Sequence, residues 1–382
     1  HVEWGVLGDF ADYEQPTKYL VESHNSNDKD TIPVLTAGKT FILGYTDEKE
    51  GIYKASQNPV IIFDDFTTAN KWVDFDFKAK SSAMKMITSK DESKALLKYI
   101  YYWLNTLPSG LVNGDHKRQW ISNYSNKQIP IPPIKIQKEI VRILDKFTEL
   151  TAELTAELTA RKKQYIYYRE QFFEFADEEI QREPLGVIGE FQRGKRFVKD
   201  DMLSEGVPCI HYGEMYTYYG TWANKSKSFL SEELVERKNL RVAENGDVVI
   251  VAAGETIEDI GLGTAWLGDE GVVIHDACFS FRSPLNPKYV AYFTRTKQFH
   301  DQIKKHISSG KISAINAKGL EKVLIPVPSP EEQERIVTIL DKFDILTTSI
   351  SEGLPKEIEL RKKQYEYYRD LLLTFPKNNI ES

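Results

Sequence analysis

Acidic residues in the first third of the chain could support metal-dependent hydrolysis. Asp64 and Asp65 follow an apolar run, and Asp76 and Lys78 come a short distance later. Paired carboxylates can hold Mg²⁺, which activates an attacking water as in metal-dependent nucleases. The same residue types are common at ordinary strand ends. A nuclease therefore stays open as an alternative, and it is not the main interpretation.

Two glycine-containing turns resemble phosphate-binding loops only in part. Gly38-Lys39-Thr40 ends like a P-loop, but Pro33 stands where that motif requires its first glycine. Residues 189–195 have the correct spacing, but Arg196 follows in place of the hydroxyl residue that binds Mg²⁺. Neither turn therefore predicts nucleotide binding.

Two cysteines and two histidines are spaced as zinc ligands could be. They form Cys209-x-His211 and His275-x-x-Cys278, and nitrogen and sulfur ligands suit tetrahedral zinc. Cys209 lies in an apolar, strand-like run, however, and small buried cysteines are common. We therefore expect no metal site, no catalytic residue and no disulfide framework in this chain.

Basic and polar residues also gather in loops. One loop, residues 115–120, reads DHKRQW, and arginine and glutamine can make paired hydrogen bonds to base edges. A solvated loop explains the same residues equally well. A second cluster lies between Phe191 and Lys199, and a third loop, around Lys311, holds the place in the second half that the first loop holds in the first. Loops in equivalent positions favour a binding surface.

A stretch that occurs twice organises the chain around these loops. The copies begin at Ile129 (IPIPPIKIQKEIVRILDKF) and Ile325 (IPVPSPEEQERIVTILDKF), and each ends in RKKQYxYYR, from Arg161 and Arg361. The second copy carries four extra residues between these parts. A repeat of this length predicts a duplicated architecture.

Each copy is expected to form a long helix. Residues 137–175 contain no glycine or proline, and their apolar residues recur three or four positions apart. The spacing predicts one apolar stripe on a helix about 58 Å long, which needs a second long helix as its partner. The second helix should break at Gly353-Leu354-Pro355. The predicted interface residues are Ile143, Phe147, Leu150, Leu154, Leu158, Tyr168, Phe172, Ile339, Phe343, Leu346, Ile350, Tyr368 and Leu372.

The two globular stretches show the same order of landmarks. Residues 32–35 and 60–63 are short β-branched runs typical of strands, and residues 95–104 are typical of a buried helix. Residues 207–210 and 248–251 repeat these strand landmarks in the second half. The fold class is therefore α+β, with two similar domains. The predicted boundaries are 1–128 for domain 1, 129–180 for the central helix, 181–324 for domain 2 and 325–382 for the C-terminal helix.

Composition limits the possible classes of protein. The chain has 382 residues, 41% hydrophobic, and a formal charge of −7, so the basic excess usual in nucleic-acid binders is absent. No apolar run approaches the roughly 20 residues that span a bilayer, and the low cysteine content suits a reducing compartment. We expect a cytoplasmic protein without a membrane partner. Because the chain begins at His1, we also expect that residues precede it.

The chain consists of a domain followed by an IPxP segment and a long helix, and this order then recurs with a diverged domain. This arrangement resembles the specificity subunit of type I restriction-modification systems. The most specific marks are the two IPxP segments, Gln333 with the ILDKF helices, the RKKQYxYYR segments and the TAEL units of the central helix. The resemblance covers essentially the whole chain. It implies two target-recognition domains joined by two conserved helices, which pair as an antiparallel coiled coil with pseudo-two-fold symmetry.

The resemblance also implies partners and a division of labour. Each domain would recognise one half of a split, asymmetric site on double-stranded DNA. Two adenine-methylating modification subunits and the ATP-driven restriction subunits would assemble around the chain. S-adenosylmethionine, ATP and Mg would bind to those partners, and no cofactor to this chain, which would not be an enzyme by itself.

Loop position and residue type select the candidate DNA-contacting residues. In the first domain they are Thr36, Lys39, Lys78, Lys80, Lys117, Arg118 and Gln119. In the second domain they are Arg193, Lys195, Arg196, His211, Tyr212 and Lys311. Two alternatives stay open beside this interpretation. A metal-dependent DNA nuclease would cleave DNA alone with Mg²⁺, and a coiled-coil scaffold would not bind DNA.

Overall fold

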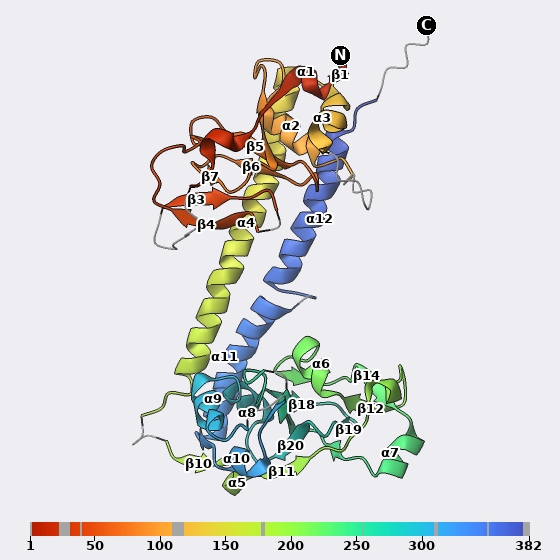
Figure 1. Ribbon diagram of the computed structural model, residues 1–382. Coiled ribbons are helices and arrows are strands. Elements are labelled where there is room, and N and C mark those ends of the chain that lie inside the picture. The colour runs from red at the N-terminus through yellow and green to blue at the C-terminus, as the bar shows by residue number, and fades with distance from the viewer. Residues whose placement is uncertain are drawn as a thin grey trace. The chain divides into compact units, whose positions relative to one another are not determined.

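The computed structural model describes residues 2–22, 31–38, 40–108, 118–176, 180–254, 256–308, 312–349 and 351–376. The chain divides into two compact units (Figure 1). Unit 1 comprises residues 1–155 and 357–382, and unit 2 comprises residues 156–356. Each unit therefore combines one globular domain with parts of both repeat copies.

The globular part of unit 1 is built on two small sheets. One has the strand order β2-β8-β5-β6 and the other the order β4-β3-β7. The strands are β1 Glu3–Val6, β2 Ala11–Glu14, β3 Ile32–Leu35, β4 Ile42–Thr46, β5 Val60–Asp64, β6 Asn70–Val73, β7 Lys78–Ala79, β8 Met84–Ser89 and β9 Gln128–Ile131. The helices are α1 Leu7–Phe10, α2 Leu97–Leu104 and α3 Gln119–Ser122, with 3₁₀ turns at Pro16–Tyr19 and Tyr124–Asn126.

Helix α2 links this domain to the repeat helices. Its buried face, with Tyr99 and Tyr102, packs with Ile140 and Leu144 of the first copy and with Leu373 of the second. All these side chains are fully or nearly fully buried. Strand β1 pairs antiparallel with β9, which carries the first IPxP segment. The core of unit 1 therefore lies where the domain meets both copies of the repeat.

Unit 2 has a larger version of the same plan. Its main sheet has the order β11-β20-β16-β18-β13, and a second sheet has the order β14-β12-β19-β15. The strands are β10 Arg182–Pro184, β11 Glu190–Arg193, β12 Val207–Ile210, β13 Trp222–Ala223, β14 Ser228–Leu230, β15 Val242–Ala243, β16 Val248–Val251, β17 Ala253–Gly254, β18 Gly263–Trp266, β19 Val272–Ile274, β20 Cys278–Arg282, β21 Ser313–Ala314 and β22 Leu324–Pro326. The helices are α5 Leu185–Ile188, α6 Tyr212–Thr217, α7 Glu232–Lys238, α8 Pro287–Phe293, α9 Lys297–Lys304 and α10 Ala317–Glu321, with a 3₁₀ turn at Lys199–Asp201.

The predicted equivalence of the two domains is confirmed strand by strand. β5 lies between β8 and β6, as β16 lies between β20 and β18. β3 pairs antiparallel with β4 and parallel with β7, and β12 pairs antiparallel with β14 and parallel with β19. Helices α6 and α7 of the second domain have no helical counterpart among the described residues of the first domain. The two units therefore share a framework of strands but differ in the segments that surround it.

The long helices follow the sequence pattern. Helix α4 runs without interruption from Ile134 to Gln171. The second copy forms α11, Pro330–Thr348, and α12, Leu354–Leu373. The predicted break between them is confirmed, and Gly353 there has φ +82°, a conformation in which glycine is favoured. Ser329 caps α11 by accepting a hydrogen bond from the Glu332 amide, as its position before Pro330 predicts.

Aromatic side chains connect the repeat copies inside each unit. In unit 1, Phe147 stacks on Tyr368 with ring centroids 5.4 Å apart. In unit 2, Tyr168 stacks on Phe343 at 5.6 Å, and Phe172 lies against the same hydrophobic core. The predicted positions Ile143, Leu150, Leu154, Leu158, Ile339, Leu346 and Leu372 are half-buried, whereas Ile350 lies outside the described residues. Within the described chain, no helix is long and apolar enough to cross a membrane.

Candidate nucleic-acid interface

A glutamine locks each domain to its repeat helix. In unit 1, buried Gln137 accepts a hydrogen bond from the Leu96 amide at 2.9 Å. Its side-chain amide donates to the carbonyl oxygens of Lys94 and Pro132 at 2.7 and 2.8 Å. This one side chain therefore fixes the start of α2, the IPxP segment and the start of α4 relative to one another.

Unit 2 repeats this junction. Gln333 accepts from the Asn286 amide at 2.9 Å and donates to the Pro328 carbonyl oxygen at 2.9 Å. The hydroxyl of Tyr289 donates to Pro326 at 3.0 Å, as the Tyr99 hydroxyl donates to Pro130 at 2.7 Å. The repeated IPxP and glutamine positions are thus explained by one anchoring arrangement that occurs in both units.

The repeated aspartate of the ILDKF segment completes the junction. Asp145 accepts from the Tyr102 hydroxyl and forms an ion pair with Lys98 at 3.1 Å. Asp341 accepts from the Tyr292 hydroxyl at 2.7 Å and pairs with Lys288 at 2.7 Å. Each lysine also lies over a tryptophan of its own domain. The helical frame is therefore held alike in both units, which leaves the loops of each domain free to differ.

Unit 2 brings most of its candidate residues to one cavity, which we call the reading cavity. It has a volume of about 740 Å³. The sequence-predicted residues that line it are Arg193, Arg196, His211 and Tyr212. Lys195, which is half-buried, lies between two lining positions, and Lys311 lies outside the described residues next to the lining residue Ile312.

Residues outside the predicted DNA-contacting set complete the reading cavity. They include Phe197, Lys199, His275 and Asp276. Phe197 packs its ring against His275 at 5.2 Å, and the rings of His211 and His275 are 4.5 Å apart. The parallel pairing of β12 with β19 places Ile210 opposite Ile274 and so brings these histidines together. The sequence pattern groups these two histidines, and the strand register explains why they lie side by side.

Which ring nitrogen of His211 carries the proton determines whether this side chain can donate a hydrogen bond to a ligand. His211 precedes α6, and its Nδ1 accepts a hydrogen bond from the Gly213 amide at 3.2 Å. An imidazole nitrogen that accepts carries no proton, so the neutral ring holds its proton on Nε2. Burial lowers the pKa of His211 to about 4, and the nearby His275 and Lys199 act in the same direction. His211 therefore contributes a neutral N–H donor to the wall of the reading cavity.

This arrangement predicts an acid-sensitive unit 2. Unfolded histidine has a pKa of about 6.5, whereas folded His211 titrates near 4. Between these values the unfolded chain binds the proton and the folded chain does not, so stability is lost as the pH falls from about 6.5 to 4. The His211→Asn variant, which keeps an oxygen acceptor at the helix start, should show a weaker loss. Thermal melts of the assembled complex at pH 7 and pH 5 measure this difference.

A matched control is His306→Asn, which changes a histidine outside the reading cavity. Its melting temperature should depend on pH as that of the wild type does. His275 and Asp276 also face His211, so some pH dependence should remain in His211→Asn. An unchanged pH dependence in His211→Asn would contradict the assignment.

The candidate residues of unit 1 are less concentrated. Arg118 is exposed at the start of α3, and Thr36 and Lys80 are half-buried at the ends of β3 and β7. The Lys80 amide donates to the Leu35 carbonyl oxygen at 2.9 Å, which holds these two strand ends together. Lys39 and Lys117 lie outside the described residues.

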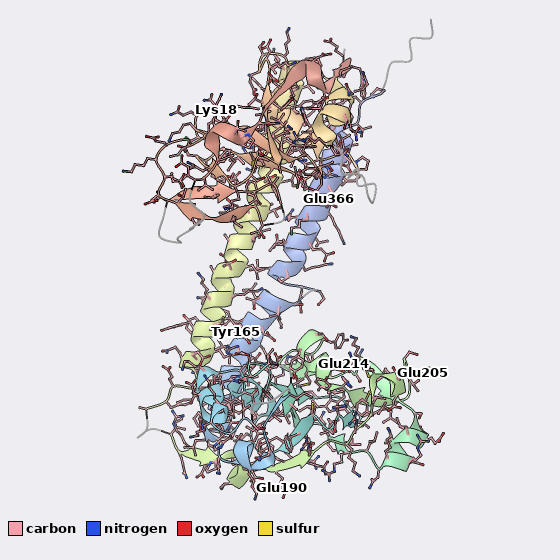
Figure 2. All side chains as sticks on the ribbon, in the orientation of Figure 1. Lys18, Tyr165, Glu190, Glu205, Glu214 and Glu366 are labelled. Carbon is pink, nitrogen blue, oxygen red and sulfur yellow. The ribbon has the colours of Figure 1, made fainter. Side chains whose placement is uncertain are left out.

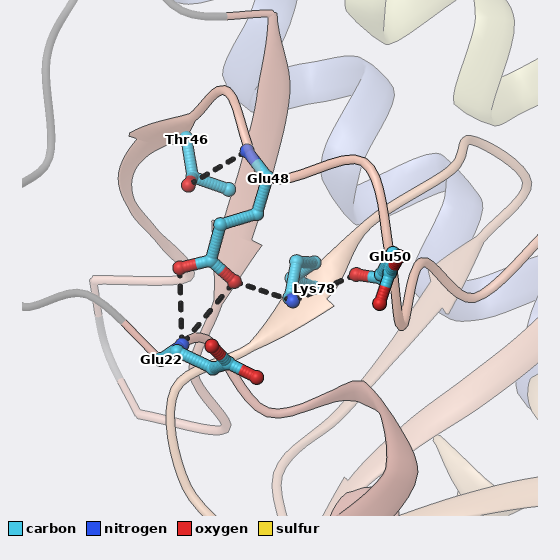
Figure 3. Close-up of polar contacts among 5 residues, drawn as sticks. All are labelled: Glu22, Thr46, Glu48, Glu50 and Lys78. Carbon is cyan, nitrogen blue, oxygen red and sulfur yellow. Dashed lines mark hydrogen bonds and ion pairs between the residues drawn. The ribbon is translucent and has the colours of Figure 1, made fainter.

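Two candidates of unit 1 have internal roles, and their burial argues against DNA contact. Lys78 is only 3% exposed, pairs with Glu48 and donates to the Glu50 carbonyl oxygen at 2.8 Å (Figure 3). Glu48 also accepts a hydrogen bond from the Glu22 amide (Figure 3). Lys78 and Glu48 together therefore connect β7, the loop at residues 48–50 and the backbone at Glu22. Gln119 is 8% exposed, and its side-chain oxygen accepts from Asn123 at 3.2 Å. Residue type alone could not reveal this burial.

The acidic residues of the nuclease alternative serve the fold. Asp64 accepts from the amides of Phe66 and Thr67 and so closes the turn after β5. Asp65 accepts from the Trp120 amide at 2.8 Å, which fixes α3. Asp76 bonds to Ser56 and Lys54. These residues lie in separate local networks, which gives a nuclease no support.

The two cysteines among the possible zinc ligands lie in different hydrophobic clusters. Cys209 packs with Phe197 and Leu230, whereas Cys278 packs in a different cluster with Trp266. Burial raises the pKa of each thiol to about 12, which opposes the thiolate form that binds metals. Within the described residues, no group of three or more histidine, cysteine or acidic side chains could hold a metal ion.

Comparisons with known proteins agree with this organisation. A family model described as "Type I restriction modification DNA specificity domain" matches residues 2–161 and 178–360. The specificity subunit of the type I restriction enzymes EcoR124I and EcoR124II of Escherichia coli is 52% identical over 390 residues, covering 98% of this chain and 95% of that protein. A putative specificity subunit of Haemophilus influenzae is 31% identical, covering 98% and 96%.

Solved structures of low sequence identity share the fold. The type I S subunit from M. genitalium superposes with a TM-score of 0.58 at 16% identity, covering 99% of this chain and 97% of that one. A chain from a structure of complex assembly in the type I restriction-modification system gives 0.59 at 16% identity, with 97% of each chain covered. Taken with the family match and the close relative, these findings show that the chain belongs to the type I restriction-modification specificity subunits.

Proposed function

We propose that this chain is the non-catalytic DNA-recognition subunit of a type I restriction-modification complex and reads a split, asymmetric DNA site. The observation that carries the proposal is the duplicated junction around Gln137 and Gln333. Two domains held in the same way, with different loops, suit one recognition event for each half of such a site. The framework positions the domains, and the loops determine which bases are read.

In unit 2, the reading cavity supplies the groups that base edges require. Arg193 and Arg196 provide guanidinium donors, and His211 adds a neutral N–H donor. Purines present acceptors in the major groove, above all N7 and O6 of guanine. Arg193 is partly fixed because its Nε donates to the Asp276 carbonyl oxygen at 2.9 Å. Tyr212, Lys195 and Lys311 would add contacts to bases or phosphates around this cavity.

In unit 1, the proposed contacts come from Thr36, Lys39, Lys80, Lys117 and Arg118. Arg118 is the strongest candidate for base contact because it is exposed, and the adjacent α3 is anchored by Asp65. Lysines on the same surface would neutralise phosphates and make binding dependent on salt. Lys78 and Gln119 are left out of this set because they are buried.

We further propose that α4 pairs antiparallel with α11 and α12 as a coiled coil with pseudo-two-fold symmetry. The stacked pairs Phe147–Tyr368 and Tyr168–Phe343 support this pairing in each unit. A helix of 38 residues is about 57 Å long. Its length would set the distance between the two half-sites, so that the bases between them are spanned without being read.

The proposed partners are two modification subunits and the restriction subunits. The equivalent residues Tyr167 and Tyr367 are 59% and 64% exposed, and exposed aromatic side chains favour protein contacts. Two equivalent surfaces on one chain suit two copies of the same partner. S-adenosylmethionine, ATP and Mg would act on those partners, and the complex would work on DNA in the cytoplasm.

Methylation mapping tests the proposal directly. DNA from cells that express this chain with its modification subunit should carry methylated adenines in both parts of one split motif. The Arg196→Gln variant should relax or abolish recognition of one half and leave the other half unchanged, because Arg196 lies in only one of the two units. Single-molecule sequencing measures both results.

Three outcomes would contradict the proposal. An assembled complex that leaves no new methylation would favour a scaffold. Mg²⁺-dependent cleavage of DNA by the chain alone would favour a nuclease. An Arg196→Gln variant with altered bases in both halves of the motif would overturn the division of labour between the units.

A further inference from the structure

Unit 2 contains a second cavity, which lies apart from the reading cavity and has a volume of about 540 Å³. It is bordered by the last turns of α4, by the end of α6 and by the end of α11 (Figure 2 labels Tyr165 on α4 and Glu214 on α6). Its charged lining residues are Arg169, Arg295 and Asp344. We call it the arginine cavity.

The two arginines have hydrogen-bonding capacity that the protein does not use. The Nε atoms of Arg169 and Arg295 are buried, and neither has a hydrogen-bond partner among the described residues. Arg295 is held in place because its Nη2 donates to the carbonyl oxygens of Gly220 and Gly263 at 2.9 and 3.0 Å. A buried donor without a partner costs free energy, so a ligand that accepts hydrogen bonds would relieve this cost.

The charges of the arginine cavity are also unbalanced. Burial lowers the pKa of Arg295; Tyr165 and Asp344 oppose this effect, and the like charge of Arg169 adds to it. Arg169 forms an ion pair with Glu170 at 3.5 Å outside the lining, and Asp344 is the one carboxyl group among the described lining residues. Burial raises the pKa of Asp344, whereas the positive charge of Arg295 acts in the opposite direction. The ligand that suits two arginine side chains and one carboxyl group is an anion with acceptor oxygens, as a phosphate group is.

Helix α6 connects this cavity to the reading cavity. Tyr212 at its beginning lines the reading cavity, and Thr217 at its end lines the arginine cavity. Six helical residues span about 9 Å, which is less than three base-pair rises of about 3.4 Å. A duplex whose bases contact the reading cavity would therefore have backbone phosphates within reach of the arginine cavity.

We propose that the arginine cavity binds a backbone phosphate of the DNA duplex whose bases contact the reading cavity. This inference rests on the proposed function and adds a positioning contact to it. Arg169 and Arg295 would donate to the phosphate oxygens and fix the register of the duplex, without reading sequence.

The other repeat copy lacks this chemistry and provides a matched control. Arg369 is the counterpart of Arg169, but its Nε donates to Asp370 at 2.8 Å. Asn105, whose side chain bonds to Asn70 and Tyr101, stands at the α2 position equivalent to Arg295 on α8. Arg169 and Arg369 both pair with the acidic residue that follows them, but of the two, in the described residues, only Arg169 has an Nε left without a hydrogen-bond partner.

The test compares three variants of the complex assembled with modification subunits. Arg169→Gln should weaken binding to a duplex carrying the mapped site and to an unrelated duplex alike, by about tenfold. The slope of log affinity against log salt should fall in magnitude by about 0.9, the value for one lost phosphate contact. Asp344→Asn should instead strengthen binding to both duplexes, because it removes a negative charge beside the phosphate. Arg369→Gln should change neither affinity nor slope.

Opposite shifts in Arg169→Gln and Asp344→Asn cannot arise from a general loss of folding. If neither variant differs from Arg369→Gln, the cavity holds only water and the proposal is overturned. If Arg169→Gln leaves DNA affinity intact but loses modification subunits, the cavity holds a carboxylate of the partner protein, which also overturns it. A wild-type complex that shows no preference for the mapped site would instead contradict the proposed function. Failure of the proposed function is thereby distinguished from failure of the phosphate-binding proposal.

Discussion

Replacing Gln137 with alanine should lower the free energy of opening of unit 1 by about 3 to 5 kcal/mol. The change removes the partner of the Leu96 amide and of the Lys94 and Pro132 carbonyl oxygens. Each buried group left without a partner costs about 1 to 3 kcal/mol. Hydrogen exchange of the amides in α2 and at the start of α4 measures this free energy locally.

Two further variants sharpen this test. Gln171→Ala on the same helix removes one exposed hydrogen bond to Glu174, and its effect should stay within about 0.5 kcal/mol. Gln333→Ala removes the equivalent anchor of unit 2, so its loss of protection should appear at α8 and the start of α11. A uniform loss over both units, or no loss at α2, would show that the glutamine is not the local anchor.

The framework could be predicted because its signals are local. The length of α4 and the break before α12 follow from helical periodicity and from glycine and proline positions, which act within a few residues. The matching strand landmarks at residues 60–63 and 248–251 proved to be central strands of equivalent sheets. The junction residues were visible as a repeat, although their hydrogen bonds were not.

The binding residues were harder to predict because burial depends on distant segments. Lys78 looked like a phosphate-binding lysine, yet Glu48 and the Glu50 carbonyl oxygen hold it inside the domain. The sequence pattern groups His211 and His275 as possible zinc ligands. They do lie side by side, because β12 pairs with β19, but the cysteines next to them in sequence pack into separate clusters. The sequence pattern therefore indicated that the two histidines lie close together, but it did not indicate that they form no zinc site with the cysteines.

The arginine cavity lies entirely beyond what the sequence indicated. Arg169 belongs to a repeated segment and has a counterpart in Arg369, so sequence alone assigns both the same role. The difference arises from what surrounds each one. Arg169 lines a cavity together with Arg295 and its Nε has no hydrogen-bond partner among the described residues, whereas the Nε of Arg369 donates to Asp370. Duplicated sequence thus supplies equivalent positions, and the diverged domains surround them with different side chains.

Inserting one further TAEL unit into α4 should lengthen the spacing between the half-sites without changing the bases read. Four residues extend a helix by about 6 Å, and the projection of this length onto the duplex axis is at most about two base-pair rises of 3.4 Å. Four residues also make one turn plus about 40°. The half-buried Leu150, Leu154 and Leu158 recur at this interval, so the apolar stripe continues through the insertion.

Methylation mapping of the variant complex should therefore return the same two half-sequences, separated by one or two additional base pairs. Replacing the threonine of one unit with alanine, which leaves the length unchanged, is the control and should keep the original spacing. The interrupted region between α11 and α12, where Gly353 already allows the chain to turn, can adjust to the longer α4 and so relieve the strain of the insertion. Unchanged spacing would mean that α4 does not measure the distance, and altered half-sequences would mean that the helix and the recognition surfaces are not independent.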